Sequence, residues 1–219
     1  MNRISKSVVI AVDGPVAAGK GTLGRRLAAH FGFAYLDTGG LYRAVALRLL
    51  RDDQTLDDAA AMVAQAGALS QADLDDPALR QEAVGEAASI ISAHPALRAA
   101  LLEYQRNYAA HPPHGAAGAV LDGRDIGTVV CPNAVVKLFI TASPEARAKR
   151  RHTELVGGGG DLSLAAVQAD LTRRDARDSE RSASPLAPAA DAHLLDTTKM
   201  DIEAAVQAAR KIVAARVED

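Results

Sequence analysis

The chain has 219 residues and a hydrophobic content of 48%, enough for one α/β domain with an insertion. A formal net charge of −2, an aromatic fraction of 3% and the lack of tryptophan argue against a nucleic-acid-binding module. The only cysteine, Cys131, cannot form an internal disulfide, which fits a reducing compartment. Because the sequence shows neither a signal peptide nor an apolar run of about 18 residues, we expect a cytoplasmic protein without a membrane span.

The first predicted elements are a strand over 8–12 and a helix from Lys20 to about His30, joined by a glycine-rich loop. The loop reads Gly14, Pro15, Val16, Ala17, Ala18, Gly19, Lys20, Gly21 and Thr22. Such loops bind phosphates, because their backbone N–H groups and the positive end of the helix attract anionic oxygens. We expect this loop to bind ATP, with Lys20 on the β and γ phosphates and the Thr22 hydroxyl on Mg²⁺. Its Gly-Lys-Gly-Thr ending resembles nucleoside monophosphate kinases more than GTPases or motor ATPases.

A second strand is predicted over 33–37 and a second helix over 41–51. The segment that joins them reads Asp37-Thr38-Gly39-Gly40-Leu41-Tyr42-Arg43. Because this segment follows a strand, it lies at the carboxyl edge of the sheet, where open α/β sheets bind ligands. Arg43 can pair there with a second phosphate. The alternative is an ordinary turn followed by residues on a helix surface.

Three later strands are predicted over 119–121, 135–140 and 193–196, each short and apolar. Ser143 and Asp201 are expected to cap the helices that follow the last two of these strands. This alternation of strands and helices predicts an α/β fold of the P-loop NTPase type, in which a parallel sheet carries helices on both faces.

Two stretches interrupt the alternation. Residues 52–114 are alanine-rich and lack a strand signature, so we interpret them as an inserted helical subdomain. Four glycines at 157–160 are either a flexible connection or the tip of a moving lid, and the arginines and acids beyond them favour the lid. The predicted division of the chain is a core over 1–51, 115–152 and 182–219, the insertion over 52–114, and a lid over 153–181.

Two charged segments are further candidates for ligand binding. Asp122-Gly123-Arg124-Asp125 directly follows a predicted strand, so Arg124 can meet a phosphate and Asp125 can accept from an exocyclic amine. The alternative is a tight turn with an internal Arg–Asp pair. Arg174, Asp178 and Arg181 share one helix face, with Arg177 beside them. Charge runs are usually solvated faces, but a phosphoryl-transfer site needs several cations and the loop supplies only Lys20.

Together these segments resemble the bacterial cytidylate kinase family over 8–43, 86–108, 119–151 and 165–197. The segment from Asp122 to Val130 is similar to a family signature by itself. The resemblance implies a monomeric enzyme that phosphorylates CMP and dCMP with ATP and Mg²⁺, without nucleic-acid or membrane partners. It assigns catalysis to Lys20, Arg174 and Arg177, with Arg177 also on ATP. It assigns CMP binding to Thr38, Tyr42, Arg43, Ser89, Arg98, Arg124, Asp125, Arg174, Asp178 and Arg181. Among these, the resemblance implies that Ser89, Arg98 and Asp125 read the cytosine edge and that Arg43, Arg124 and Arg181 hold the CMP phosphate.

The chain departs from the family pattern in its loop and its insertion. The family usually has a polar residue in place of Val16 and glycine in place of Ala17, whose methyl group fits if φ is negative there. The insertion lacks the small antiparallel sheet that the family often has. Another small kinase of the same fold, for adenylate, uridylate or shikimate, remains an alternative.

A GTP-binding switch is a remote alternative. Residues 37–40 and 198–201 fit the short motifs of such proteins, but only 16 residues separate Lys20 from Asp37. That length is too short for the helix, switch loop and two strands that a GTPase places there.

Overall fold

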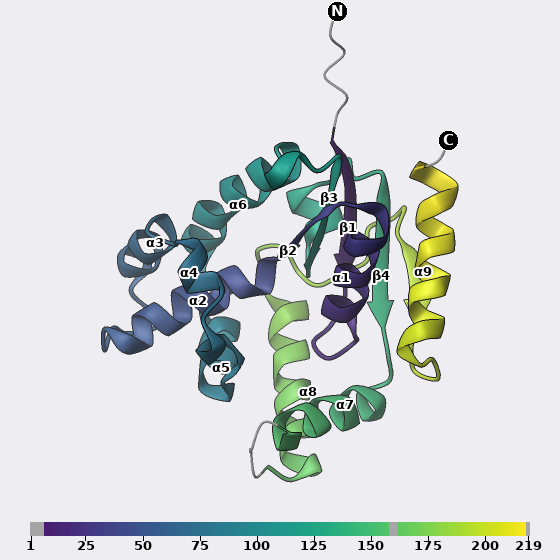
Figure 1. The fold of residues 1–219 in the computed structure, drawn as a ribbon. Coiled ribbons are helices and arrows are strands. Elements are labelled where there is room, and N and C mark those ends of the chain that lie inside the picture. The colour runs from purple at the N-terminus through teal and green to yellow at the C-terminus, as the bar shows by residue number, and fades with distance from the viewer. Residues whose placement is uncertain (1–6, 158–161, 218–219) are drawn as a thin grey trace, which may run out of the picture.

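The computed structural model describes residues 7–157 and 162–217, whose centre is a sheet of five parallel strands in the order β2-β3-β1-β4-β5 (Figure 1). The strands are β1 Val8–Asp13, β2 Ala34–Asp37, β3 Gly118–Gly123, β4 Val136–Thr141 and β5 His193–Asp196. Side chains of the three central strands are almost all buried, as in a sheet covered on both faces. The fold class predicted from the sequence is confirmed.

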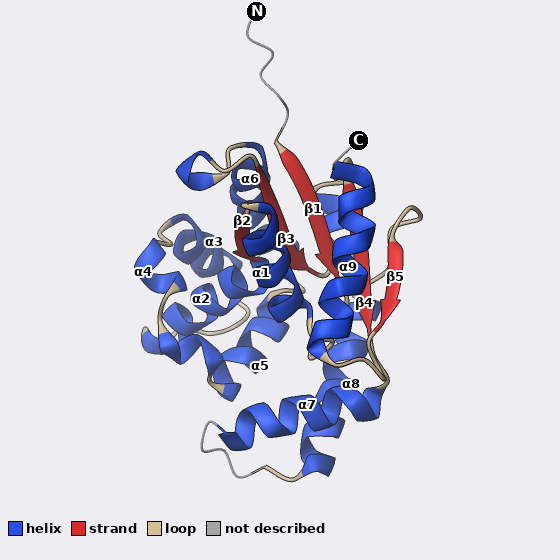
Figure 2. Cartoon of the chain, turned by 45° about the vertical axis from the view of Figure 1, so that its right-hand side comes forward, coloured by secondary structure: helices blue, strands red, loops and turns tan. Residues whose placement is uncertain are grey.

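Helices cover both faces of the sheet because its buried side chains alternate between two apolar cores. Ile10 and Val12 of β1 pack with α1 (Lys20–Phe31) and α9 (Ile202–Val217), which stand in front of the strands in Figure 2. Ala11 belongs to the other core, with α2 (Thr38–Arg51) and α6 (Pro95–Ala110). The glycine-rich loop therefore emerges between two rigid layers.

The segment 52–114 is helical, as predicted, and contains no strand among its residues, all of which the structure describes. Its elements are α3 Ala59–Gly67, α4 Gln71–Leu74, the turn η1 Pro77–Arg80, α5 Glu82–Ile91, α6 and the turn η2 Pro113–Gly115. Leu41, Val45 and Leu49 of α2 share one apolar core with Val84 and Ile91 of α5. The insertion is thus packed on the helix that follows β2.

Two helices, α7 (Pro144–Gly157) and α8 (Leu164–Glu180), lie beyond the carboxyl ends of the strands (Figure 2). They pack on each other through Ala148, Val167 and Leu171, with Val16 of the loop against this small cluster. The predicted lid tip at 157–160 falls, except for Gly157, outside the described residues. Among the residues that are described, no helix has both the length and the apolar character needed to cross a membrane.

Helix starts follow their capping side chains. Ser143 Oγ accepts from Ala146 N at 3.2 Å and Asp201 Oδ1 from Ala204 N at 2.8 Å, so both predicted caps are confirmed. The predicted start of α2 at residue 41 is wrong, because the helix begins three residues earlier, at Thr38. The cause is Asp37, whose carboxylate accepts from Gly40 N at 3.0 Å and caps the helix directly at the end of β2.

Candidate active site

A cavity of about 1250 Å³ opens at the carboxyl edge of the sheet, between the glycine-rich loop, the insertion and α8. Its volume exceeds the roughly 300–1,000 Å³ of a pocket for one small ligand. The predicted site residues that line it are Val16, Ala17, Lys20, Gly21, Thr38, Tyr42, Arg43, Ser89, Arg98, Arg124, Asp125, Arg174, Asp178 and Arg181. The predicted residues that are described but do not line it are Gly14, Pro15, Ala18, Gly19, Thr22 and Arg177.

Lys20 is the first residue of α1 and the loop wraps around it. Its Nζ donates to the carbonyl oxygen of Pro15 at 2.8 Å, and the residue is 6% exposed. Burial, reinforced by the positive charge of Arg124, lowers the pKa of Lys20 to about 7. An anionic phosphate in the cavity would favour the charged form of the amine, so the loop is suited to bind phosphate through this lysine.

The loop backbone explains which of its residues are glycine. Gly14 has a φ of 145°, and a Cβ there would lie 1.9 Å from the carbonyl oxygen of Ile140. Ala17 has a φ of 59°, in the left-handed region. The negative φ that would suit its methyl group is therefore not present, and that expectation is wrong. The loop holds a strained alanine where glycine would be relaxed.

Ala17→Gly is expected to raise the free energy of unfolding by about 0.5–1 kcal/mol, because glycine adopts this φ without strain but gains entropy in the unfolded chain. For a chain of this size the melting temperature would rise by roughly 2 °C. Thermal unfolding of Ala18→Gly, a buried neighbour outside the positive-φ region, is the control and should show a loss of stability. A melting temperature of Ala17→Gly at or below that of the wild type would contradict the strain.

Two carboxylates that the sequence-based site had left out lie side by side at the strand ends, because Asp37 and Asp122 are register partners on β2 and β3. Tyr35 donates its hydroxyl to Asp122 Oδ2 at 2.6 Å, and Arg43 donates to Asp37 Oδ2 at 2.6 Å. Burial and the charge of Asp37 raise the pKa of Asp122. Burial acts in the same direction on Asp37, but the Arg43 guanidinium and the Gly40 N–H outweigh it and lower the pKa of Asp37.

These carboxylates fit Mg²⁺, which prefers oxygen ligands and is usually held by one or two carboxylates together with nucleotide phosphates. Both line the cavity, and the charge of Asp122 acts on Lys20. Within 7–157 and 162–217, no three His, Cys, Asp or Glu side chains gather as a metal cage. Thr22, the ligand predicted from the sequence, is exposed on the first turn of α1, and its role at the metal stays a prediction.

The structure brings together Arg98 and Asp125, two of the three residues predicted to read the base. They form an ion pair, and Arg98 also donates to the carbonyl oxygen of Ser92 at 3.1 Å. The Arg98 guanidinium carbon lies 5.7 Å from the centre of the Tyr42 ring. The third residue, Ser89, instead accepts from Arg177 at 2.5 Å. Arg98 and Asp125 are thus brought together, whereas Ser89 is bonded to Arg177 of α8.

Two arginines predicted for the acceptor phosphate meet at Asp178. Arg124 Nε lies 2.9 Å from Asp178 Oδ2, and Arg181 NH1 lies 3.7 Å from Asp178 Oδ1. Arg181 also donates to the carbonyl oxygen of Ser184 at 2.6 Å, while its NH2 is buried with no hydrogen-bond partner among the described residues. Burial and the charge of Arg98 lower the pKa of Arg181. A buried cationic donor without a partner is suited to an incoming anion.

Glu86 of α5, which sequence reasoning missed, holds Arg174 and Arg177 of α8 close to α5. Arg177 donates to Glu86 Oε1 at 2.9 Å, and Arg174 Nε lies 3.5 Å from Glu86 Oε2. In this arrangement Arg177 does not reach the cavity beside Lys20, so its assignment to ATP stays a prediction. No motif marked Glu86, because its partners lie far along the chain.

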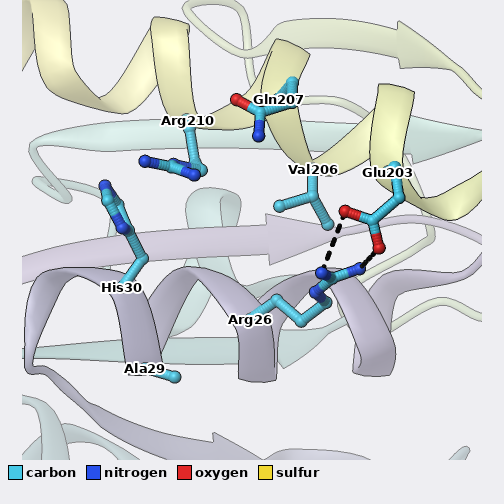
Figure 3. A pocket seen from close by; sticks show the side chains of 7 residues that line it. All are labelled: Arg26, Ala29, His30, Glu203, Val206, Gln207 and Arg210. Carbon is cyan, nitrogen blue, oxygen red and sulfur yellow. Dashed lines mark hydrogen bonds and ion pairs between the residues drawn. The ribbon is translucent and has the colours of Figure 1, made fainter.

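A second, smaller cavity of about 290 Å³ lies between α1 and α9, where Arg26 and Glu203 form an ion pair (Figure 3). It contains none of the predicted site residues and lies away from the loop lysine.

Cys131 follows the segment after β3, and burial raises the pKa of its thiol to about 11. A thiol with this pKa is not an activated nucleophile.

Comparison with known proteins identifies the family. A family model described as cytidylate kinase matches residues 10–215. A curated cytidylate kinase of Rhodopseudomonas palustris (strain ATCC BAA-98 / CGA009) is 55% identical over 95% of this chain and 96% of that protein. Another, of Methylobacterium sp. (strain 4-46), is 60% identical over 95% of this chain and 98% of that protein. A solved structure of an uncharacterized protein from Eubacterium ventriosum aligns with a TM-score of 0.53 at 11% identity, covering 97% of this chain and 99% of that one, which supports the fold alone. The chain belongs to the cytidylate kinase family.

Proposed function

We propose that the chain transfers the γ-phosphoryl group of ATP to CMP, and to dCMP, in the presence of Mg²⁺. Membership of the cytidylate kinase family supports this activity. The observation that carries the proposal is one cavity whose walls include both the loop lysine, Lys20, and the Arg98–Asp125 pair. A site for two nucleotides needs this combination, a phosphate loop on one side and a base-reading pair on the other.

We assign ATP to the loop over 14–22 and CMP to the opposite wall. Arg43, Arg124 and Arg181 hold the acceptor phosphate by charge-assisted hydrogen bonds. Asp125, Arg98 and Ser89 read the cytosine edge, and Asp178 and Arg174 meet the ribose or the phosphate. Thr38 and Tyr42 complete this wall. Asp125 pairs with Arg98 and Asp178 pairs with Arg124, and these ion pairs would orient the two arginines for the nucleotide.

The reaction needs no general base, because the acceptor phosphate is already an anion at neutral pH. A CMP phosphate oxygen attacks the γ phosphorus in line, the bond to the β–γ bridging oxygen breaks, and ADP leaves. Lys20 and the loop N–H groups stabilise the charge that moves onto the leaving phosphate, with Arg174 and Arg177 contributing when the lid closes. Mg²⁺, which the carboxylates of Asp37 and Asp122 and the hydroxyl of Thr22 would hold, would supply further neutralisation of the phosphate charge.

The division of labour follows the three parts of the chain. We propose that the core over 1–51, 115–152 and 182–219 binds ATP, that 52–114 binds the acceptor, and that 153–181 closes over both. The contact between Arg147 and the loop supports this lid, since Arg147 donates to the carbonyl oxygen of Val16 at 3.2 Å and to Asp175 Oδ2 at 2.5 Å. We further propose that the enzyme acts as a monomer in the cytoplasm on diffusible nucleotides.

A GTP-binding switch does not suit this structure. Asp37 ends β2 and caps α2 at once, so 37–40 leaves no room for a switch loop. The Thr198 hydroxyl donates a hydrogen bond to Asp196 Oδ1 and accepts one from Ser143 N at 2.8 Å. This segment closes the end of β5 against the start of α7.

Asp125→Asn is expected to narrow the preference for CMP over UMP by roughly 10–100-fold in relative kcat/KM, the size of effect that follows from mispairing a buried polar group. A carboxylate only accepts hydrogen bonds, whereas the amide of asparagine can also donate to the uracil carbonyl. Steady-state kinetics of both substrates, in wild type and variant, measure the change. Asp175→Asn, which removes a charge from the lid outside the cavity lining, should leave the ratio unchanged. If Asp125→Asn lowers both rates alike, base selection lies with Ser89 and Arg98 instead.

A further inference from the structure

A single π-helical turn, η3 (Ile126–Val130), directly follows Arg124 and Asp125. Its wide hydrogen bonds run from Val130 N to the carbonyl oxygen of Asp125 at 3.1 Å and from Cys131 N to that of Ile126 at 2.7 Å. Turns of this type are rare, and they occur frequently at functional sites. Arg124 and Asp125, to which we assign acceptor binding, therefore directly precede a turn of an uncommon backbone conformation, and their positions depend on the contacts that hold this turn.

The amino end of η3 is held by Asp13, the last residue of β1. Its Oδ1 accepts from Ile126 N at 2.8 Å and its Oδ2 from Gly127 N at 2.7 Å. These are N–H groups that the start of a helical turn leaves free, and a negative charge is favourable there. A Cβ at Gly127 would lie 3.3 Å from Asp13 Oδ2 and 3.1 Å from Lys137 Cδ, so a side chain there would have to displace one of these two side chains slightly.

The carboxyl end of η3 is held by Arg106 of α6. Arg106 NH2 donates to the carbonyl oxygen of Val129 at 2.9 Å, and its Nε donates to that of Val130 at 3.1 Å. A cation is favourable at this end of the turn, as an anion is at the other. Arg98 lies on the same helix, about two turns earlier. The turn is thus clamped between the strand that leads into the loop and the helix that carries Arg98.

We propose that Asp13 and Arg106 are positioning residues for the acceptor nucleotide, acting through η3 to set the place of Arg124 and Asp125. The inference rests on the proposed function, because it names what orients the residues assigned there to CMP. Neither Asp13 nor Arg106 lines the cavity within the described part of the chain, so they act without touching the substrate.

The burial of Asp13 supports a specific role. The residue is 5% exposed, and this burial raises its pKa to about 6, although the two hydrogen bonds that it accepts from backbone N–H groups act in the opposite direction. A buried carboxylate is costly in a fold, and its two oxygens reach two adjacent N–H groups that no apolar side chain could satisfy. Because Asp13 immediately precedes Gly14, the same residue ties the acceptor side to the phosphate loop.

Arg106→Ala is the first test, because Arg106 is exposed and its loss should not unfold the protein. We expect the dissociation constant for CMP to rise roughly tenfold, the effect of one charge-assisted hydrogen bond between CMP and a displaced Arg124 or Asp125, and that for ATP to change less than about twofold. Arg106→Lys, which restores one donor, should recover part of the affinity. Arg26→Ala is a matched control, since it removes an arginine from an ion pair between two helices outside the cavity (Figure 3).

Asp13→Asn is the second test. The side-chain N–H of the asparagine would face a backbone N–H of η3. We therefore expect the affinity for CMP to fall more than in Arg106→Ala, and the preference for CMP over UMP to narrow. Separate titrations with CMP and ATP, together with melting temperatures, give the readout. If Asp13→Asn does not fold, Arg106→Ala decides alone.

Two results would overturn the inference. One is a folded Arg106→Ala variant with unchanged affinity for CMP. The other is an equal loss of CMP and ATP binding, which would mean that the clamp serves stability alone. The proposed function fails in a different way, through a wild-type protein that does not bind CMP. If the wild type binds CMP, and Arg124→Ala lowers the affinity for CMP while Arg106→Ala does not, the proposed function stands. Only the positioning role of Asp13 and Arg106 is then refuted.

Discussion

Lys20→Ala is expected to lower kcat by about 10³-fold without unfolding the protein, within the range that removing one preorganised charge from a transferring phosphoryl group costs. The amine is buried in the loop, donates to the carbonyl oxygen of Pro15 and faces the cavity, so few other groups can replace it. Single-turnover rates of CDP formation, with circular dichroism to verify the fold, measure the effect.

The exposed lysine of α9, Lys211, provides the control, and Lys211→Ala should keep full turnover. A Lys20→Ala variant that retains more than about a tenth of the wild-type turnover would contradict the electrostatic role assigned to the lysine.

Arg181→Ala and Arg124→Ala should each weaken the binding of CMP by about 1.5–3 kcal/mol, or roughly 10–150-fold in affinity, while the affinity for ATP changes little. The buried NH2 of Arg181 has no partner among the described residues, and Arg124 is held towards the cavity by Asp178. Isothermal titration with each nucleotide separates the two effects. Arg173→Ala on α8, where the arginine is exposed and paired with Asp170, is the control and should bind both nucleotides normally. Equal losses for CMP and ATP would place these arginines on the wrong substrate.

The sheet could be predicted from the sequence because each strand is a short apolar run that ends at a polar residue. Asp13 and Asp37 end their strands and Asp122 is the last residue but one of β3, and parallel strands bring such ends to one edge. The start of α2 could not be placed correctly, because a pattern of apolar residues does not reveal that the Asp37 side chain turns back to cap the helix. The φ of Ala17 was also beyond reach, since local pattern carries no information about one dihedral angle.

The site could be predicted where its residues lie in compact motifs. Lys20 follows from the spacing of the loop, and Arg124 and Asp125 from their place after a strand. Ser89 and Arg98 came from the family resemblance alone. The supporting contacts could not be found, because their partners are distant along the chain; Asp13 and Ile126, for example, are 113 positions apart. Only the folded chain shows that these residues meet.

The measurement that tests the account most directly is the transfer of phosphate from ATP to a panel of acceptors. Initial rates with CMP, dCMP, UMP, AMP and shikimate, at saturating ATP and Mg²⁺, give kcat/KM for each. We predict that CMP and dCMP are used best, at least roughly tenfold better than UMP, because the buried Arg98–Asp125 pair matches the cytosine edge. A higher kcat/KM for AMP or shikimate, or no transfer to CMP, would contradict the assignment of this cavity to cytidylate.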